Sequence, residues 1–174
     1  MKLFRKIIVI LTFFSFTELS ALAETPHFID FKYILNQSDA GKKAQDFLKN
    51  KLEKGIKNLQ EKEKKIQAEE KKIIQQKKVI SAEEYKKKVT SLRNKVSQLQ
   101  KERQTLLNSV ATQRQKARNE LLKNLNPIVK TYMNENNIRM VIDKKNLLLA
   151  DENLDITKQI IKLLNKQLKS ISLN

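Results

Sequence analysis

The stretch EKEKKIQAEEKKIIQQKKVI, residues 61–80, carries the pattern from which the architecture of this chain follows. It has no glycine or proline, few large apolar residues and many more lysines than acidic residues. Its isoleucines nevertheless belong to a series of apolar residues spaced seven apart. The series is Leu52, Leu59, Ile66, Ile73 and Ile80. A spacing of seven keeps side chains on one stripe of a helix that winds at the coiled-coil period, so this stretch predicts one leg of a coiled coil.

A second long helix is predicted after a break at Ser81. In the sequence SAEE, Ser81 can cap a helix and Glu84 lies three residues on, which is a capping-box pattern. Beyond it, core positions alternate steps of four and three, with two polar interruptions. These positions are Tyr85, Val89, Leu92, Val96, Leu99, Arg103, Leu106, Val110, Gln113 and Ala117.

The break at Ser81 is compatible with one continuous rod or with a hairpin. If the chain folds back there, the two apolar stripes meet. The facing pairs are Leu52 with Val110, Leu59 with Arg103, Ile66 with Val96 and Ile73 with Val89. Heptads can match by chance about one time in four, so the match favours an antiparallel hairpin without proving it. The alternate layers set charged or small residues against leucines, which predicts a hairpin about 60 Å long that is loosely zipped.

Two residues interrupt the helical pattern. Gly55, inside the first leg, costs about 1 kcal/mol relative to alanine, and it is either a hinge or a tolerated glycine. Pro127 removes a helix hydrogen bond and is expected to kink or restart the return helix where the arm meets the body.

The rest of the chain predicts a small β-containing body. Strands are expected at HFIDF (27–31), IRMVID (138–143) and NLLLA (146–150), with Lys144 and Lys145 in a tight turn between the last two. A closing helix is expected to begin near Asp155 or Thr157. Its buried side would hold Ile160, Ile161, Leu163, Leu164 and Leu168.

The chain is therefore expected to be an α+β protein, mainly α, in three parts. Residues 1–23 would be a cleaved signal, residues 24–41 and 127–174 the body, and residues 42–126 the helical arm, with its tip near 80–84. A body of about 66 residues is marginal for an independent core and leaves sheet edges open. Joining several chains through their sheets would enlarge the core and pair the open edges, so a closed homo-oligomer is expected.

The first residues have the three parts of a secretory signal. Lys2, Arg5 and Lys6 form a positive region, residues 7–16 are apolar, and Ala21-Leu22-Ala23 is a small-residue cleavage site. The apolar run is about half of the roughly 20 residues that a bilayer span needs. An exported, periplasmic protein is expected.

The composition favours a binding protein over an enzyme. The chain has no cysteine and one histidine, His27, which is most simply a strand-edge residue; no phosphate loop and no metal-ligand spacing occurs. Asp143, Asp151 and Asp155 suit turn and helix-cap roles. No catalytic residue, metal site or cofactor is therefore expected.

Positive charge is concentrated in the predicted arm. Residues 42–118 hold 23 lysine and arginine residues against 9 acidic ones, whereas the whole chain has a formal net charge of +17. A solvated helix face explains any single lysine, but collectively the surplus attracts acidic polypeptides or anionic lipid. Nucleic acid is a poor partner, because the chain is exported and the arm lacks interleaved aromatic residues for base stacking.

Two segments resemble the Skp/OmpH family of periplasmic chaperones. ADENLDITKQIIKLLN, residues 150–165, is similar to that family's closing strand-to-helix signature, and FIDFKYILNQSDAGKKAQ, residues 28–45, is similar to its opening strand and first helical turn. The resemblance covers essentially the whole chain after the signal. It implies a jellyfish-like homotrimer with a small β-barrel body and three helical tentacles around a cavity.

The resemblance also implies a function. Members of the family hold unfolded outer-membrane β-barrel proteins without ATP and deliver them for assembly, and a basic lipopolysaccharide-binding site has been proposed for them. Candidate positions for anionic lipid or acidic clients are Lys77, Lys78, Lys86, Lys87 and Lys88. Loosely packed apolar residues are candidates for client binding, namely Ile56, Leu92, Leu99 and Leu106. The alternatives are a basic coiled-coil envelope protein that binds lipopolysaccharide or another anionic surface, or a structural spacer.

Overall fold

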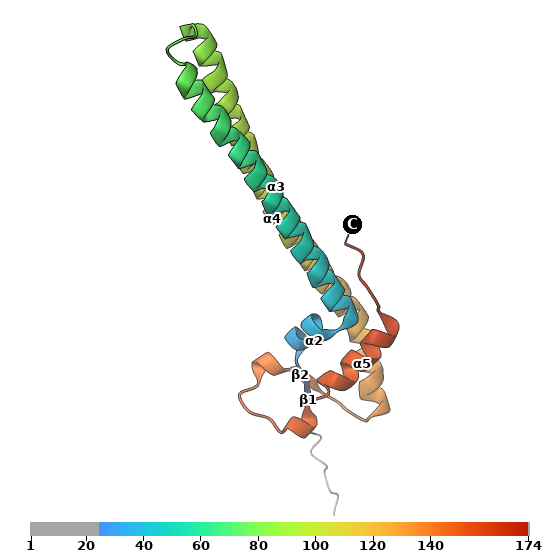
Figure 1. Cartoon of the computed structure of the whole chain (residues 1–174). Coiled ribbons are helices and arrows are strands. Elements are labelled where there is room, and N and C mark those ends of the chain that lie inside the picture. Colours follow the sequence, from blue (N-terminus) through green and yellow to red (C-terminus); the bar gives the residue numbers. More distant parts are fainter. Residues whose placement is uncertain (1–24, 174) are drawn as a thin grey trace, which may run out of the picture.

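The structure is a long helical hairpin that stands on a small mixed body (Figure 1). The computed structural model describes residues 25–173, so the predicted signal segment lies outside the described residues. In chain order the elements are β1 (His27–Ile29), α2 (Phe31–Gln37), α3 (Asp39–Gln76), α4 (Ala82–Glu135), β2 (Val141–Asp143), the 3-10 turns η1 (Lys144–Asn146) and η2 (Glu152–Leu154), and α5 (Thr157–Gln167).

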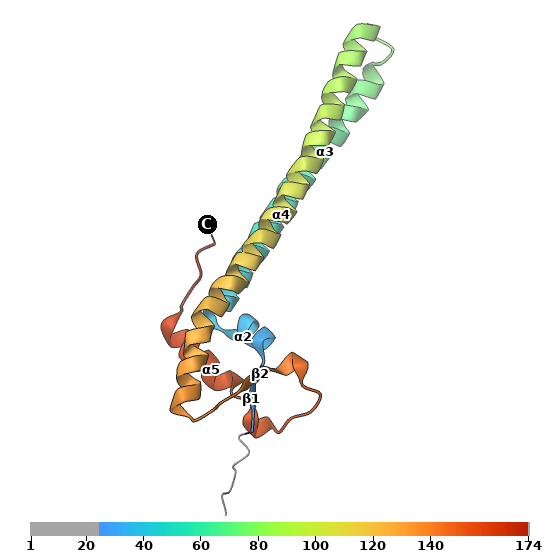
Figure 2. The ribbon, with the colours of Figure 1, turned by 180° about the vertical axis from the view of Figure 1, so that it is seen from behind.

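Helices α3 and α4 form the hairpin, and both views show them side by side along their length (Figures 1 and 2). The break falls at residues 77–81, as the sequence predicts, and the rod is excluded. Ser81 Oγ accepts a hydrogen bond from the backbone N–H of Glu84 at 3.1 Å, which caps the start of α4. Ser38 caps α3 in the same way, accepting from Gly41 at 3.2 Å.

Polar contacts between the two helices establish the register. Lys62 Nζ lies 2.6 Å from Glu102 Oε2, Lys95 Nζ lies 2.6 Å from Glu69 Oε2, and Lys88 Nζ donates to Gln76 Oε1 at 2.8 Å. The residue numbers of each pair sum to 164, two more than in the predicted core pairing, because these side chains flank the seam instead of filling it. Leu52 packs against the cluster that holds Val110, as the predicted pairing expects, whereas the pairs of Leu59, Ile66 and Ile73 stay predictions.

Packing along the seam is uneven. The buried members of the two predicted stripes are Leu59, Ile73, Leu99, Val110 and Ala117. By contrast, Val96 and Arg103 are exposed, and Ile66, Val89 and Leu92 are half-buried. The expectation of a loosely zipped hairpin agrees with this pattern.

The two predicted interruptions have different outcomes. A Cβ atom at Gly55 would lie 2.5 Å from Leu106 Cδ2, so the glycine makes room for a leucine of the facing helix, and α3 runs through it without a break. The predicted restart at Pro127 is wrong, because α4 continues from Ala82 to Glu135. Leu125 and Ile128, on either side of the proline, are both buried in the body, and this burial offsets the lost hydrogen bond.

The strands are shorter than predicted. β1 pairs in parallel with β2, with His27 opposite Val141 and Ile29 opposite Asp143. HFIDF ends as a strand at Ile29 because Asp30 accepts a hydrogen bond from the N–H of Tyr33 and so caps α2. Of the strand predicted at 138–143, residues 141–143 are extended in the sheet.

The strand predicted at 146–150 is wrong. The predicted tight turn at Lys144 and Lys145 is instead the 3-10 turn η1, and residues 147–151 have no regular structure. The apolar run has no partner strand within the described residues, and Leu148 and Leu149 are 97% and 90% exposed. The described sheet has two strands, so the barrel-like body and the trimer stay predictions.

The core of the body lies where α2, α5 and the lower part of α4 meet. Its buried residues are Ile34, Ala40, Leu121, Leu125, Ile128, Ile138, Ile156, Ile160 and Leu164. Helix α5 begins at Thr157 as predicted and buries Ile160 and Leu164, while Ile161, Leu163 and Leu168 are half-buried. The core thus ties the base of the arm to the body.

Candidate binding surface on the helical arm

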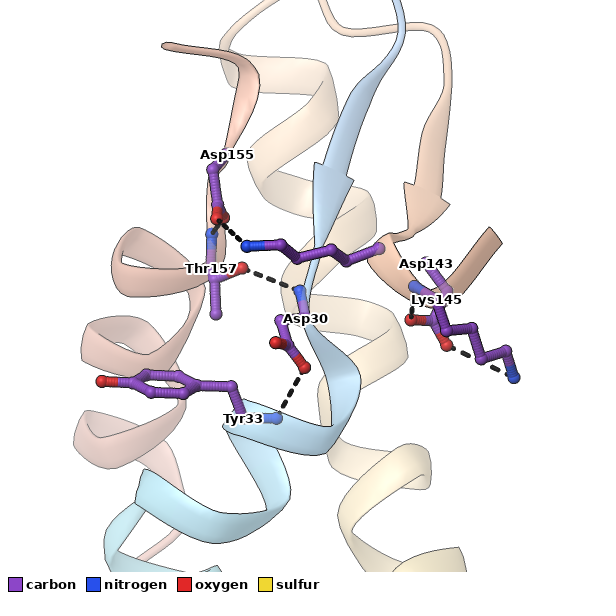
Figure 3. A network of polar contacts seen from close by, with 7 residues as sticks. Asp30, Tyr33, Asp143, Lys145, Asp155 and Thr157 are labelled. Atoms are coloured by element: carbon purple, nitrogen blue, oxygen red, sulfur yellow. Dashed lines mark hydrogen bonds and ion pairs between the residues drawn. The ribbon is translucent and has the colours of Figure 1, made fainter. Parts of the chain in front are cut away.

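The aspartates of the body serve turns and caps. Asp143, Asp151 and Asp155 each accept a hydrogen bond from the backbone N–H two residues on, at 3.2, 2.9 and 2.8 Å. Figure 3 shows how this network joins the elements: the N–H of Asp30 donates to the hydroxyl of buried Thr157 at 2.8 Å. The three carboxylates therefore cap local turns and the start of α5, while the Thr157 hydroxyl holds the end of β1 against α5.

The described residues offer little for catalysis or for a metal ion. Between residues 25 and 173, no group of three or more histidine, cysteine, aspartate or glutamate side chains is placed to hold a metal. His27 lies in β1, where its buried Nδ1 has no hydrogen-bond partner. In the same part of the chain, every helix is too short or too polar to cross a bilayer.

Most acidic residues of the arm are engaged by lysine or arginine. Of the nine between residues 42 and 118, ion pairs hold Glu53, Glu63, Glu69, Glu83, Glu84 and Glu102. Three of these pairs cross between α3 and α4 and so align the two helices. The hydrogen bond from Lys62 lowers the pKa of Glu102 below its ordinary value. The remaining surplus, 23 basic minus 9 acidic residues or 14 charges, faces solvent along the arm.

The four apolar residues predicted to bind clients lie in different environments. Ile56 is 42% exposed, while Leu92 and Leu106 are half-buried. Leu99 is 6% exposed and belongs to the seam, so in this conformation it is not available to a partner. The structure does not gather the four into one patch, because Ile56 and Leu106 lie in the lower half of the arm and Leu92 lies nearer the tip.

Sequence reasoning missed other exposed apolar residues on the arm. They are Phe47, Ile74, Val79, Val96 and Leu107. Ile74 and Leu107 directly follow seam residues, Ile73 and Leu106. Successive residues of a helix point about 100° apart, so the second member of such a pair must turn away from the seam. These adjacent apolar pairs were the signal available in the sequence.

The five candidate lysines lie around the tip of the hairpin, three of them with partners. Lys87 and Lys88 pair with Glu83 and Glu84 on the same helix, and Lys77 Nζ lies 5.8 Å from the centre of the Tyr85 ring. All except Lys88 are exposed, as is Val79 beside them. The tip therefore combines cations with one apolar side chain.

A basic, two-helix arm on a small α/β body defines the class of the protein as a helical-hairpin binding protein. A family model described as "Outer membrane protein (OmpH-like)" matches residues 27–164, so the chain belongs to this family. The Skp/OmpH resemblance seen in the sequence is thus confirmed.

A solved structure supports the same fold. It is the crystal structure of a protein from Caulobacter crescentus described as an OmpH-like outer membrane chaperone, and it superposes with a TM-score of 0.78. The match covers 85% of this chain and 89% of that one, at 19% sequence identity. A comparison with curated proteins gives no match.

Proposed function

We propose that this chain is a periplasmic chaperone that binds unfolded outer-membrane β-barrel proteins without ATP, prevents their aggregation and delivers them for assembly. In this proposal residues 24–41 and 127–174 form the oligomerisation body and residues 42–126 the binding arm. Membership of the OmpH-like family supports a chaperone role, and it fits a chain that is not an enzyme.

One observation carries the proposal: the arm combines a surplus of 14 positive charges with isolated exposed apolar side chains along its length. Long-range attraction brings an acidic unfolded chain to the arm quickly, and single apolar contacts then hold it weakly at many points. Because each of these contacts is weak by itself, the client can be released without an energy source.

Aggregation of a urea-unfolded outer-membrane barrel protein on dilution tests this function. We expect a stoichiometric amount of the chain to suppress light scattering, whereas a structural spacer would leave it unchanged. A protein whose target is an anionic surface would instead bind lipopolysaccharide vesicles in preference to the unfolded protein.

Stopped-flow binding tests the electrostatic part. Raising the salt concentration should slow the association of client with the arm much more than it speeds release, because steering acts on the encounter. An association rate that does not change with salt would contradict capture by charge.

A further inference from the structure

The chain does not end with α5 but returns along the base of the arm. Residues 168–173 leave α5 and run beside the lower part of the hairpin (Figures 1 and 2). Leu173 is only 4% exposed, and it is buried with Ala44 and Leu48 of α3 and with Val110 and Ala117 of α4. Ile171 packs against the same cluster. We call residues 168–173 the tail.

The last residues of the tail, 170–173, have the side-chain pattern of a strand that lies with one face on a surface. Lys169, Ser170 and Ser172 are exposed, whereas Ile171 and Leu173 face the hairpin. Successive side chains of an extended backbone point to opposite sides, so apolar residues at every second position all meet the arm.

The polar contacts of the tail are few and mostly independent of its sequence. Gln113 Nε2 donates to the backbone carbonyl of Leu173 at 2.6 Å, a bond that any residue at that position could accept. Lys169 Nζ lies 3.5 Å from Asp39 Oδ2, but both side chains are largely exposed, so water screens this pair. The site therefore selects for extended backbone and apolar spacing, not for one particular sequence.

The tail only partly fills the surface on which it lies. A groove of about 640 Å³ continues from Ile171 towards α2. Its floor is apolar, with Leu48, Leu52, Val110 and Leu121, and Leu35 forms the wall on the α2 side. Lys49, Arg114 and Arg118 are exposed at its edge. Asn36, Gln45 and Asp46 complete its polar lining. The open groove thus has room for more polypeptide than the tail supplies, and its rim is polar with a net positive charge.

We propose that this groove is a binding site for extended polypeptide segments with apolar residues at every second position, and that the tail is a resident occupant which such a segment displaces. Strands of membrane β-barrels alternate in this way, so the inference rests on the proposed function and names a site for it. Because the tail is attached, it competes at a high effective concentration for the part of the apolar surface that it covers, so a client must displace the tail to use that part together with the open groove.

Two sets of variants with opposite expectations test the site. Ile171→Ser with Leu173→Ser releases the tail and opens the groove. Gln113→Cys with Leu173→Cys is designed to lock the tail by a disulfide between two residues that already contact each other, and because the chain has no other cysteine, mass measurement of the oxidised protein distinguishes a bond within one chain from a bond between two. Ser170→Ala with Ser172→Ala, which changes exposed positions of the same segment, is the matched control.

The probe is a fluorescent peptide, TSISLTISLST, whose apolar residues stand at every second position. Its binding is measured by anisotropy beside that of TSSILTSSILT, which has the same composition with its apolar residues adjacent. If the tail covers the groove about nine-tenths of the time, the open variant binds the alternating peptide about tenfold more tightly than the parent chain. The locked variant binds more weakly than the parent and recovers on reduction, while the control is unchanged. Circular dichroism confirms that all variants keep their helices.

Equal affinity of the parent, open and locked chains, or equal binding of the two peptides, would overturn the inference. Its failure is distinguishable from failure of the proposed function. If the parent chain suppresses aggregation but the locked variant binds the peptide equally well when oxidised and when reduced, only the groove proposal is refuted. If the parent chain does not suppress aggregation, the chaperone proposal is refuted.

Discussion

At the scale of single residues, each of the two glycines stands where a side chain would collide with a neighbouring residue. A Cβ atom at Gly41 would overlap the carbonyl oxygen of Leu35 and crowd Ser38 Oγ, which caps α3 through the Gly41 N–H. Gly41 therefore lets the end of α2 lie against the first turn of α3. This gives a physical reason for Ser38 and Gly41 within residues 28–45, one of the two segments that resemble the family.

Replacing Gly41 by alanine should destabilise the body. The added methyl group meets backbone, which cannot rotate away as a side chain can, and overpacking of this kind costs about 1–3 kcal/mol. Urea unfolding followed by circular dichroism, at one fixed protein concentration, measures the loss. Lys43→Ala, at an exposed position of the same helix, is the control and should change little; equal stability of Gly41→Ala and the parent would refute the explanation.

Gly55 and Leu106 should show strong coupling. Gly55→Ala gains about 1 kcal/mol of helix propensity but pushes Leu106 out of its place, so alone it should not stabilise the arm. In the background of Leu106→Ala the clash is absent, and the same change should stabilise by about 1 kcal/mol. A double-mutant cycle of unfolding free energies tests this, and additive effects would favour a merely tolerated glycine.

At the scale of elements, the sequence predicts the helices much better than the strands. The heptads of α3 and α4 predict both the hairpin and its register, because two long periodic patterns constrain each other. The strand predicted at 146–150 fails because apolar content alone does not make a strand, and Leu147, Leu148 and Leu149 have no partner within the described chain. Which apolar residues of the arm stay exposed also depends on packing: Leu99 is buried and Ile56 is not, although both fit the pattern.

The cross-helix pair Lys62–Glu102 should make the arm sensitive to acid. The hydrogen bond from Lys62 lowers the folded-state pKa of Glu102 below its ordinary value of 4.5, so the stabilisation is present above that value and is lost as the pH falls through the lower folded-state pKa. The thermal unfolding midpoint of the Glu102→Gln variant should therefore fall less than that of the parent when the pH is lowered. The effect is small because the pair is solvated, and Glu61→Gln, at an exposed position of α3, is the control.

At the scale of the whole molecule, the body presents apolar surface that a single chain leaves uncovered. Leu148 and Leu149, in the segment after β2, are 97% and 90% exposed, and Met140, directly before β2, is 57% exposed. Exposure of this extent marks an interaction site more often than a free surface. It supports the expected homo-oligomer, in which the segment at 146–150 pairs with another copy.

Replacing Leu148 and Leu149 together by serine should weaken self-association and leave the fold of the arm intact. Sedimentation equilibrium measures the oligomer, and circular dichroism measures the helices. Val79→Ser, at an exposed apolar position on the tip, should leave the assembly unchanged. A parent chain that sediments as a monomer, or a double variant that assembles as the parent does, would contradict the assignment of this surface.

The parallel pairing of β1 with β2 has a consequence for the order in which the chain folds. The two strands are separated in sequence by the entire arm, so the sheet cannot close cheaply while that segment is unfolded. Once the hairpin zips from its turn, it carries Asp39 next to residues 123–125 of α4, so the loop that separates the strands shrinks from the whole arm to the short segments at its base. If the chain left a membrane pore N-terminus first, β1 would therefore have no pairing strand until α4 and β2 had emerged. The helical arm would thus form before the sheet of the body.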